Sequence, residues 1–276
     1  MRTLIHISDL HFGRTEAVLE DALRQLIGRE EPDMVIVSGD ITQRATILQF
    51  QEAETFFASL PFPLFIVPGN HDVPLYSFWK RFYRPYKGYK LHISEDLEPE
   101  YQDDSIAIIG LNTVRVYRMK EGQINQYQID RVHRLFKKLP PHLVKIVVSH
   151  HPFNIPETHY KRPLSQVRHF WAGLQETGID MFLSGHLHDT LTRYEDIAYK
   201  LPINAEGPLI IQAGTAISTR RRKEGNAFNI IRIERPHIAI ERYVSEKGES
   251  TFTLVKTEHF LQKEKGWIRE KRAASA

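Results

Sequence analysis

The sequence predicts an α/β protein in which the buried strands of a mostly parallel sheet alternate with amphipathic helices. Short apolar runs recur along the chain, and each has the length of one buried strand. The segments between the early runs carry apolar residues at helical spacing. Strands that alternate with helices favour parallel pairing, because each helix carries the chain back to the start of the next strand.

Each expected element has its own pattern. The apolar runs that predict strands are residues 3–8, 34–38, 64–67, 105–111, 143–149, 181–184 and 209–212. Residues 15–29 and 46–59 carry one apolar face each and are expected helices. Residues 228–233 and 237–244 are expected to be consecutive strands around a turn at Arg235-Pro236. From residue 263 onward the chain is charged, and we expect a short helix that frays at its end.

The composition is that of an ordinary globular protein. Of 276 residues, 41% are hydrophobic and 26% are charged, which predicts a single domain over residues 1–262 and a charged tail over residues 263–276. The net charge of +3 is too small to indicate a nucleic-acid partner by itself. The sequence shows neither a signal-peptide core nor an apolar run long enough for a membrane span, so we expect a cytoplasmic protein.

Residues 76–89 hold an unusual density of aromatic side chains. The aromatic residues are Tyr76, Phe78, Trp79, Phe82, Tyr83, Tyr86 and Tyr89, with Lys80, Arg81, Arg84 and Lys87 between them. One interpretation is an amphipathic helix that buries its aromatic face. The other is a cap over an active site whose cations face an anionic substrate, and both can hold in part. This segment, or the strands at residues 228–244, could also form a homodimer interface.

Polar residues that can bind metal follow five of the expected strands. These groups are Ser8-Asp9-Leu10-His11, Ser38-Gly39-Asp40, Gly69-Asn70-His71-Asp72, Ser149-His150-His151 and Gly185-His186-Leu187-His188. Ligands collect at the carboxyl ends of the strands in an open α/β sheet, so parallel pairing would bring the five groups together. In Asp9-x-His11 and His186-x-His188, alternate residues of an extended segment would point to the same side. The glycines at 39, 69 and 185 would allow the backbone turns that aim the ligands.

The groups contain seven potential metal ligands: Asp9, His11, Asp40, Asn70, His150, His186 and His188. The chain has no cysteine, which excludes thiolate sites, and imidazole with oxygen ligands suits Mn, Fe, Zn or Co better than Ca. Seven ligands are too many for one ion and suit two, with Asp40 as the bridge. One ion would take Asp9, His11, Asp40 and His188, and the other Asp40, Asn70, His150 and His186. Two metals roughly 3.5–4 Å apart suit in-line displacement at phosphorus.

With these motifs the chain resembles the calcineurin-like metallophosphoesterase superfamily, from residue 4 to about residue 245. Within it, the chain is most similar to bacterial class III cyclic nucleotide phosphodiesterases and glycerophosphodiesterases, which share the Gly-Asn-His-Asp and His-His-Pro motifs. The resemblance implies a four-layer αββα sandwich with two mixed sheets flanked by helices. It also implies two divalent metal ions per chain, with Mn or Fe favoured and Zn or Co as further possibilities.

The resemblance assigns roles beside the metals as well. The family residue that matches His71 is not a ligand but stabilises or protonates the leaving oxygen, and Asp72 would orient it. A histidine suits this proton transfer because it titrates near neutral pH, while a purely structural His71 is the alternative. The family ligand lies two residues before the proline, which selects His150 and leaves His151 as a supporting residue.

Three further residues are candidates for substrate binding. Arg220 and Arg222 belong to a basic cluster that is either a solvated turn or an anion-binding loop, since arginine can contact phosphate in a bidentate manner. Asn112 follows an expected strand and could line the pocket.

These inferences predict hydrolysis of a small phosphodiester, such as a cyclic nucleotide or a glycerophosphodiester, by a metal-bridging hydroxide that attacks phosphorus. A phosphomonoesterase or pyrophosphatase acting on a nucleotide or lipid precursor is the alternative. A nuclease is disfavoured because the net charge is small and the sequence shows no appended DNA-binding domain. A non-catalytic scaffold is disfavoured further, because every ligand position and His71 are filled.

Overall fold

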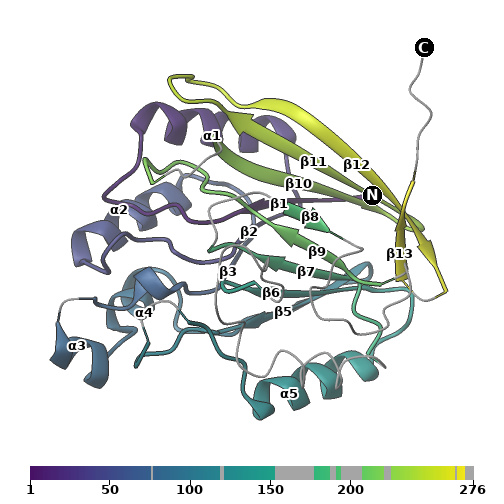
Figure 1. The fold of residues 1–276 in the computed structure, drawn as a ribbon, viewed down its shortest axis with the longest axis horizontal. Helices are drawn as coiled ribbons and strands as arrows, with labels where there is room; N and C mark the ends of the chain where they lie inside the picture. The colour runs from purple at the N-terminus through teal and green to yellow at the C-terminus, as the bar shows by residue number, and fades with distance from the viewer. Residues whose placement is uncertain are drawn as a thin grey trace.

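The protein folds into four layers, with two β-sheets stacked face to face between helices (Figure 1). A computed structural model provides this fold, and the structure describes residues 1–75, 77–118, 121–152, 177–186, 191–193, 207–220, 225–264 and 266–270. Within these residues, no helix is long and apolar enough to cross a lipid bilayer. The αββα architecture expected from the sequence is confirmed.

The first sheet joins the start of the chain to its end. Its described strands follow the order β13-β12-β11-β10-β1-β2-β3. Their bounds are β1 (Arg2–Ile7), β2 (Met34–Val37), β3 (Leu64–Ile66), β10 (Asn226–Glu234), β11 (His237–Ser245), β12 (Thr253–Lys263) and β13 (Gly266–Arg269). The first three strands are parallel, whereas β10 to β13 pair antiparallel with one another and β10 pairs antiparallel with β1.

The second sheet is built from the middle of the chain, in the order β4-β5-β6-β7-β9-β8 among its described strands. Their bounds are β4 (Glu100–Gln102), β5 (Ile106–Leu111), β6 (Val144–Ser149), β7 (Met181–Ser184), β8 (Leu191–Arg193) and β9 (Leu209–Gln212). β4 and β8 are antiparallel edge strands, and the strands between them are parallel. Both sheets are therefore mixed, and the expected parallel pairing holds for β1, β2 and β3 in the first sheet and for β5, β6, β7 and β9 in the second.

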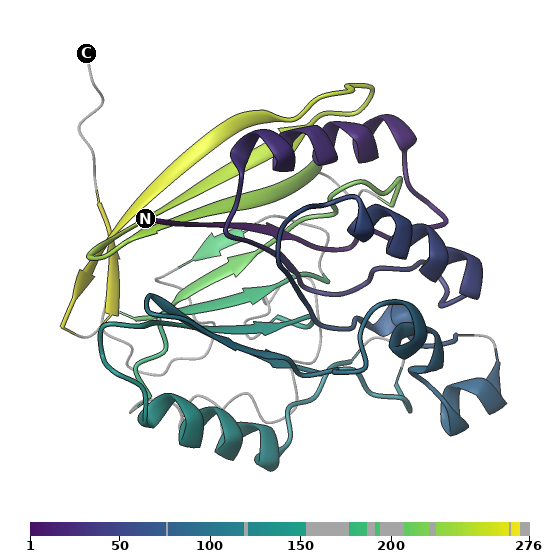
Figure 2. The same cartoon turned by 180° about the vertical axis from the view of Figure 1, so that it is seen from behind.

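Helices cover the outer face of each sheet (Figures 1 and 2). α1 (Ala17–Glu30) and α2 (Ile47–Ala58) lie over the first sheet, and α5 (Gln126–Lys137) lies over the second. Ile5 of β1 packs beneath α1 and α2, whereas the adjacent Leu4 packs between the sheets, because successive strand side chains point to opposite faces. A third core lies under α5 around Phe136.

The aromatic segment forms two short helices. These are α3 (Phe78–Tyr83) and α4 (Lys87–His92), and Pro85 lies in the connection between them. A proline cannot continue a helix from the preceding residues without losing a backbone hydrogen bond, so one long helix is excluded. Both helices lie at the same end of the molecule as α2 (Figure 2).

Burial within this segment is mixed. Tyr89 is fully buried, but Trp79 is 68% exposed and Tyr83 is 74% exposed, while Tyr76 and the Phe78 side chain lie outside the described part. The buried guanidinium of Arg81 fixes α3 by donating to backbone carbonyl oxygens, among them that of Val116 at 2.6 Å. The interpretation as one helix with a buried aromatic face therefore holds for Tyr89 and is wrong for the two exposed rings.

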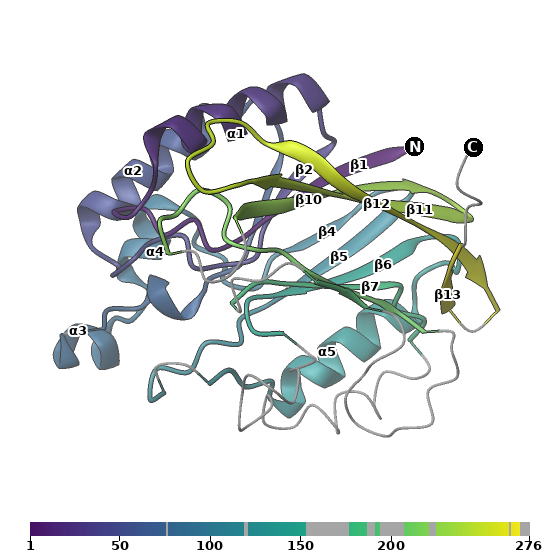
Figure 3. The same ribbon diagram turned by 45° about the horizontal axis from the view of Figure 1, so that its top comes forward.

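The helix expected after residue 263 is wrong, because Gly266–Arg269 forms the edge strand β13 (Figure 3). Trp267 is fully buried in the core between the sheets, and its Nε1 donates to Asp180 Oδ1 at 2.8 Å. Burying this large ring outweighs the charge of the flanking residues. The expected boundary between a domain at residues 1–262 and a tail at residues 263–276 would separate β13 from β12, with which it pairs. Residues 271–276 lie outside the described part.

Candidate metal centre

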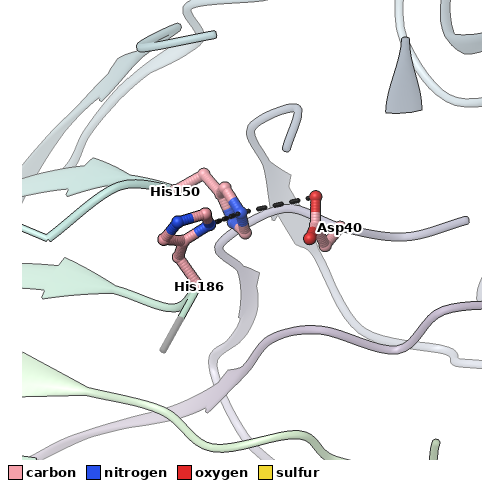
Figure 4. Close-up of side chains that lie close together, drawn as sticks. All are labelled: Asp40, His150 and His186. Carbon is pink, nitrogen blue, oxygen red and sulfur yellow. Dashed lines mark hydrogen bonds and ion pairs between the residues drawn. The ribbon is translucent and has the colours of Figure 1, made fainter. Parts of the chain in front are cut away.

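Five loops from the carboxyl ends of parallel strands meet at one place. Asp9 and His11 follow β1, Asp40 follows β2, Asn70 follows β3, His150 follows β6 and His186 follows β7. Figure 4 shows that His150 and His186 come from strands of the second sheet, while Asp40 approaches from the first. The centre therefore lies at the seam between the sheets, and neither sheet could build it alone.

The backbone of these loops is unusual. Asp9, His11, Asp40 and His186 have positive φ angles of 53°, 52°, 51° and 73°. Aspartate and histidine adopt this left-handed region more readily than most residues, yet it costs free energy and persists only where the surroundings enforce it. The extended geometry expected for Asp9-x-His11 is therefore wrong, and left-handed turns aim both side chains.

Two of the three motif glycines are needed for close packing rather than for a turn. A Cβ on Gly69 would overlap the backbone and side chain of Asp40, and a Cβ on Gly185 would overlap Ser8. Gly69 has a φ of −106°, which any residue can adopt. At Gly39, by contrast, the φ of +90° agrees with the turn expected there.

Two groups of buried side chains could each hold a metal ion, and Asp40 belongs to both. In the first group, His11 Nε2 lies 3.7 Å from Asp9 Oδ1 and 3.9 Å from Asp40 Oδ2. In the second, His150 Nε2 lies 3.3 Å from Asp40 Oδ1 and 3.1 Å from His186 Nδ1. The carboxylate shared by the two groups belongs to Asp40, the residue that the sequence predicts as the bridging ligand.

Asn70 completes the set of expected ligands that the structure describes. It begins the short 3-10 helix η1 (Asn70–Asp72) after β3, and its Oδ1 lies 3.1 Å from His150 Nε2. His188 lies outside the described residues. The structure thus brings together the six other side chains, and their role as ligands stays a prediction.

Backbone carbonyls set the tautomers of two histidines. His150 Nδ1 donates to the carbonyl oxygen of Ser38 at 2.8 Å, and His11 Nδ1 donates to that of Thr42 at 3.4 Å. A neutral imidazole that carries its proton on Nδ1 has its lone pair on Nε2. Both Nε2 atoms face Asp40, so the donor set fits a divalent transition metal.

The centre couples Asp40 and His150 electrostatically. Burial alone would raise the pKa of Asp40, but the charges of His150 and His71 outweigh it and hold that pKa well below its usual range. Burial likewise opposes the charged form of His150, yet the neighbouring Asp40 carboxylate raises the pKa of His150 to about 9. A bound cation would replace the proton on Nε2 and interact with the same carboxylate.

His71 lies beside the centre and contacts a second candidate residue. Its Nδ1 donates to the carbonyl oxygen of Gln43 at 2.8 Å, and Arg220 Nη1 donates to its Nε2 at 3.0 Å. The backbone N–H of His71 donates to Asp40 Oδ1 at 2.8 Å, which ties it to the shared carboxylate. The sequence contained no signal for Gln43, because a backbone carbonyl makes this contact.

Asp72 does not orient the His71 ring. Its buried carboxylate accepts hydrogen bonds from the backbone N–H groups of Gly69 at 2.8 Å and Thr42 at 2.8 Å. Burial, together with the charge of Asp40, raises the pKa of Asp72 to about 6. The expectation that Asp72 sets the tautomer of His71 is wrong, and its contacts instead clamp the loops after β2 and β3 to each other.

A family comparison identifies the family of the chain. The profile described as calcineurin-like phosphoesterase matches residues 2–190 of the chain. The chain belongs to the calcineurin-like phosphoesterase family. It is therefore a member of a family of phosphoric ester hydrolases, and the match includes every expected ligand.

Two proteins are similar to this phosphoesterase in sequence, and one solved structure is similar to it in fold. A segment of 80 residues is 40% identical to the glycerophosphodiester phosphodiesterase GpdQ of Enterobacter lignolyticus, covering 25% of this chain and 29% of that protein. A probable glycerophosphodiester phosphodiesterase GpdQ of Arcobacter nitrofigilis is 22% identical over 238 residues, covering 82% of this chain and 78% of that protein. The purple acid phosphatase PPD1 from yellow lupin (Lupinus luteus) seeds has a TM-score of 0.67 at 12% identity, covering 94% of this chain and 53% of that one.

Three further residues singled out by the sequence lie in different environments or outside the described part of the chain. Asn112 uses its side chain within the protein: its Nδ2 donates to the Tyr86 hydroxyl at 3.0 Å, and its Oδ1 accepts from Val114 N at 3.1 Å. His151 is buried, and its Nδ1 lies 2.8 Å from the Thr113 hydroxyl, which agrees with a supporting role. Arg222 lies outside the described residues.

Proposed function

We propose that this phosphoesterase hydrolyses phosphodiesters with two divalent metal ions. The observation that carries the proposal is the buried Asp40 carboxylate shared by two ligand groups. Two metals held by one bridging ligand are suited to in-line displacement at phosphorus, because they neutralise charge on the attacking and leaving oxygens.

The proposed ligands divide between the two sites according to the short distances within each group of side chains. Asp9, His11 and Asp40 would hold one ion, joined by His188, and Asp40, Asn70, His150 and His186 would hold the other. When bound, the ions supply Lewis acidity towards phosphate oxygens and activation of water at neutral pH. Imidazole and carboxylate ligands suit Mn or Fe, and also Zn or Co.

His71 is the proposed general acid for the leaving oxygen. The Gln43 carbonyl holds the proton on Nδ1, which leaves Nε2 facing Arg220. Protonation at Nε2 would give a donor for the departing alkoxide, and a histidine can carry that proton near neutral pH. A protonated Nε2 can no longer accept from Arg220, so the guanidinium would instead donate to a phosphate oxygen.

A diester is the proposed substrate class. The two GpdQ relatives are named as glycerophosphodiester phosphodiesterases, and a proton donor beside the metals helps most when the leaving group is a poor one. Hydrolysis rates on p-nitrophenyl phosphate and bis(p-nitrophenyl) phosphate would separate a monoesterase from a diesterase. A higher kcat/KM on the monoester would replace the diester assignment.

The test uses bis(p-nitrophenyl) phosphate with added Mn and compares the wild type with Asp40→Asn. We expect about two metal ions per wild-type chain, and a loss of activity of about a thousandfold in the variant, since several kcal/mol of transition-state stabilisation would go. Asp104→Asn, which changes an exposed carboxylate, is the matched control. Full activity or full metal content in the Asp40 variant would exclude the two-metal mechanism.

A further inference from the structure

A cavity of about 740 Å³ lies between the start of α2 and helices α3 and α4. We call it the cap pocket, and the lining residues that matter here are Arg44, Phe50, Trp79, Lys80, Arg84 and Lys87. Its volume is within the range of small-molecule sites in proteins. No expected metal ligand lines it, so it is distinct from the metal centre.

The charge of the cap pocket has one sign. Among the described residues that line it, Arg44, Lys80, Arg84 and Lys87 are cationic, and none is acidic. Within the described part of the chain, no carboxylate lies within ion-pair distance of Lys80, Arg84 or Lys87. Uncompensated cations around a concave surface raise the local concentration of anions.

The body of the cap pocket is apolar and aromatic. The rings of Trp79 and Tyr83 stack on each other with centroids 5.5 Å apart and an interplanar angle of 23°. Both rings are largely exposed, whereas Phe50 is buried. Exposed aromatic surface gathered at one concavity marks a binding site more often than isolated exposed residues do, and flat rings stack readily on such a platform.

The cap pocket adjoins the proposed general acid. Gln43, whose carbonyl oxygen accepts from His71, is followed directly by Arg44 of the pocket wall. On the other side of His71, the chain passes from Asp72 through Val73 to Pro74, which also lines the pocket. The wall of the cap pocket therefore begins one residue after Gln43 and two residues after Asp72, next to the segments that contain and contact His71.

We infer that the cap pocket binds the leaving alcohol of the phosphate ester, and that this alcohol has an apolar or aromatic body and a negative charge of its own. The inference rests on the proposed function for the position of the scissile phosphate. Glycerol is small, uncharged and covered with hydroxyl groups, so it would leave the aromatic platform and the cations of this pocket without contacts. A nucleoside phosphate and an acyl glycerophosphate both have the required chemistry.

Binding of product-like probes to the full chain tests this inference without catalysis. Calorimetry on the EDTA-treated protein would compare adenosine 5′-phosphate, octanoyl glycerophosphate below its micelle concentration, and glycerol 3-phosphate. We expect one of the two bulky probes to bind at least about tenfold more tightly than glycerol 3-phosphate. The probe that binds identifies the source of the ligand, nucleotide or lipid.

Two pairs of substitutions place the binding site. Lys80→Gln with Lys87→Gln should weaken the preferred probe about tenfold, because two of the four positive charges at the cap pocket are removed. Lys137→Gln with Lys138→Gln makes the same change at exposed positions on and beside α5 and should leave binding unchanged. Equal affinity for all three probes, or a cap variant that binds like the wild type, would overturn the inference.

The hydrolysis assay separates this inference from the proposed function. Wild-type activity on bis(p-nitrophenyl) phosphate together with absent probe binding would reject the cap-pocket inference alone. Probe binding with no metal-dependent hydrolysis would reject the proposed function alone.

Discussion

Single residues at the metal centre adopt costly conformations that the surrounding structure supports. Asp40 has a left-handed backbone with a φ of 51°, and its carboxylate lies between His150 with His186 and Asp9 with His11. Left-handed geometry at a residue other than glycine costs of order 1–3 kcal/mol. The loops enclose Asp40 closely. The backbone N–H of His71 donates to Asp40 Oδ1, and any side chain at residue 69 would overlap Asp40.

Arg220, which lies beside His71, is expected to support catalysis by contacting the phosphate. Arg220→Ala should lower kcat/KM for bis(p-nitrophenyl) phosphate by about tenfold or more, because the proposed contact of its guanidinium with a phosphate oxygen is a charge-assisted hydrogen bond, which contributes about 1.5–3 kcal/mol. Arg220→Lys should recover part of the loss, since it keeps the charge without the planar guanidinium. Steady-state kinetics at fixed metal content provide the measurement.

The exposed Arg134 of α5 offers a matched control for that experiment. Arg134→Ala should have wild-type kinetics. If Arg220→Ala also kept wild-type kinetics while binding the same amount of metal, Arg220 would have no role in the reaction.

At the scale of elements, the C-terminal segment forms a strand that its local sequence pattern does not predict, because of its tertiary contacts. The 263–270 segment is charged around one tryptophan, which favours an exposed tail from the sequence alone. In the fold, Gly266 has a φ of 147° and Trp267 pairs with Gly207 by a 3.0 Å backbone hydrogen bond. The edge strand β13 therefore exists because the core between the sheets accepts one large ring.

Trp267→Ala is expected to lower the free energy of unfolding by about 3–5 kcal/mol, because it leaves a cavity and removes one hydrogen bond to Asp180. Trp79→Ala makes the same chemical change at a ring that is 68% exposed and should change stability far less. Urea denaturation followed by circular dichroism measures both. Equal losses in the two variants would show that Trp267 is not part of the folded core.

At the scale of the whole molecule, two sheets must dock before a metal centre exists. The interface between them is mainly apolar, but His6 of β1 lies in it with no exposed surface. Its Nε2 lies 2.9 Å from the Ser38 hydroxyl, and burial lowers the pKa of His6 to about 3. Docking the sheets therefore requires a neutral imidazole at this position.

Acid should destabilise the fold through His6. The unfolded chain would bind a proton at His6 below about pH 6.5, whereas the folded chain resists it down to about pH 3, so stability is full above pH 6.5 and falls as the pH drops. The slope from this one group approaches about 1.4 kcal/mol per pH unit within that window. Urea unfolding at pH 7, 6 and 5 measures the slope.

His6→Gln should reduce that slope, because glutamine can keep a hydrogen bond to Ser38 without titrating. His142→Gln, at an exposed position, is the control and should leave the slope unchanged. A His6 variant with the wild-type slope would assign the acid sensitivity to other groups.

The sequence by itself determined the strands that end in polar motifs, the family and the residues of the candidate centre that the structure describes. Those features are local, since a short apolar run followed by Asp, Asn or His is visible within a few residues. It also predicted that Asp40 would be shared, because seven ligands suit two ions.

Only the tertiary structure decided how those residues are aimed and what surrounds them. The left-handed turn at Asp9, the β13 strand and the cap pocket depend on contacts between segments far apart in the chain. The carbonyl that sets the tautomer of His150 belongs to Ser38, 112 residues away. Backbone carbonyls are present at every residue, so no sequence pattern can select the one that the packed sheets bring within hydrogen-bond distance.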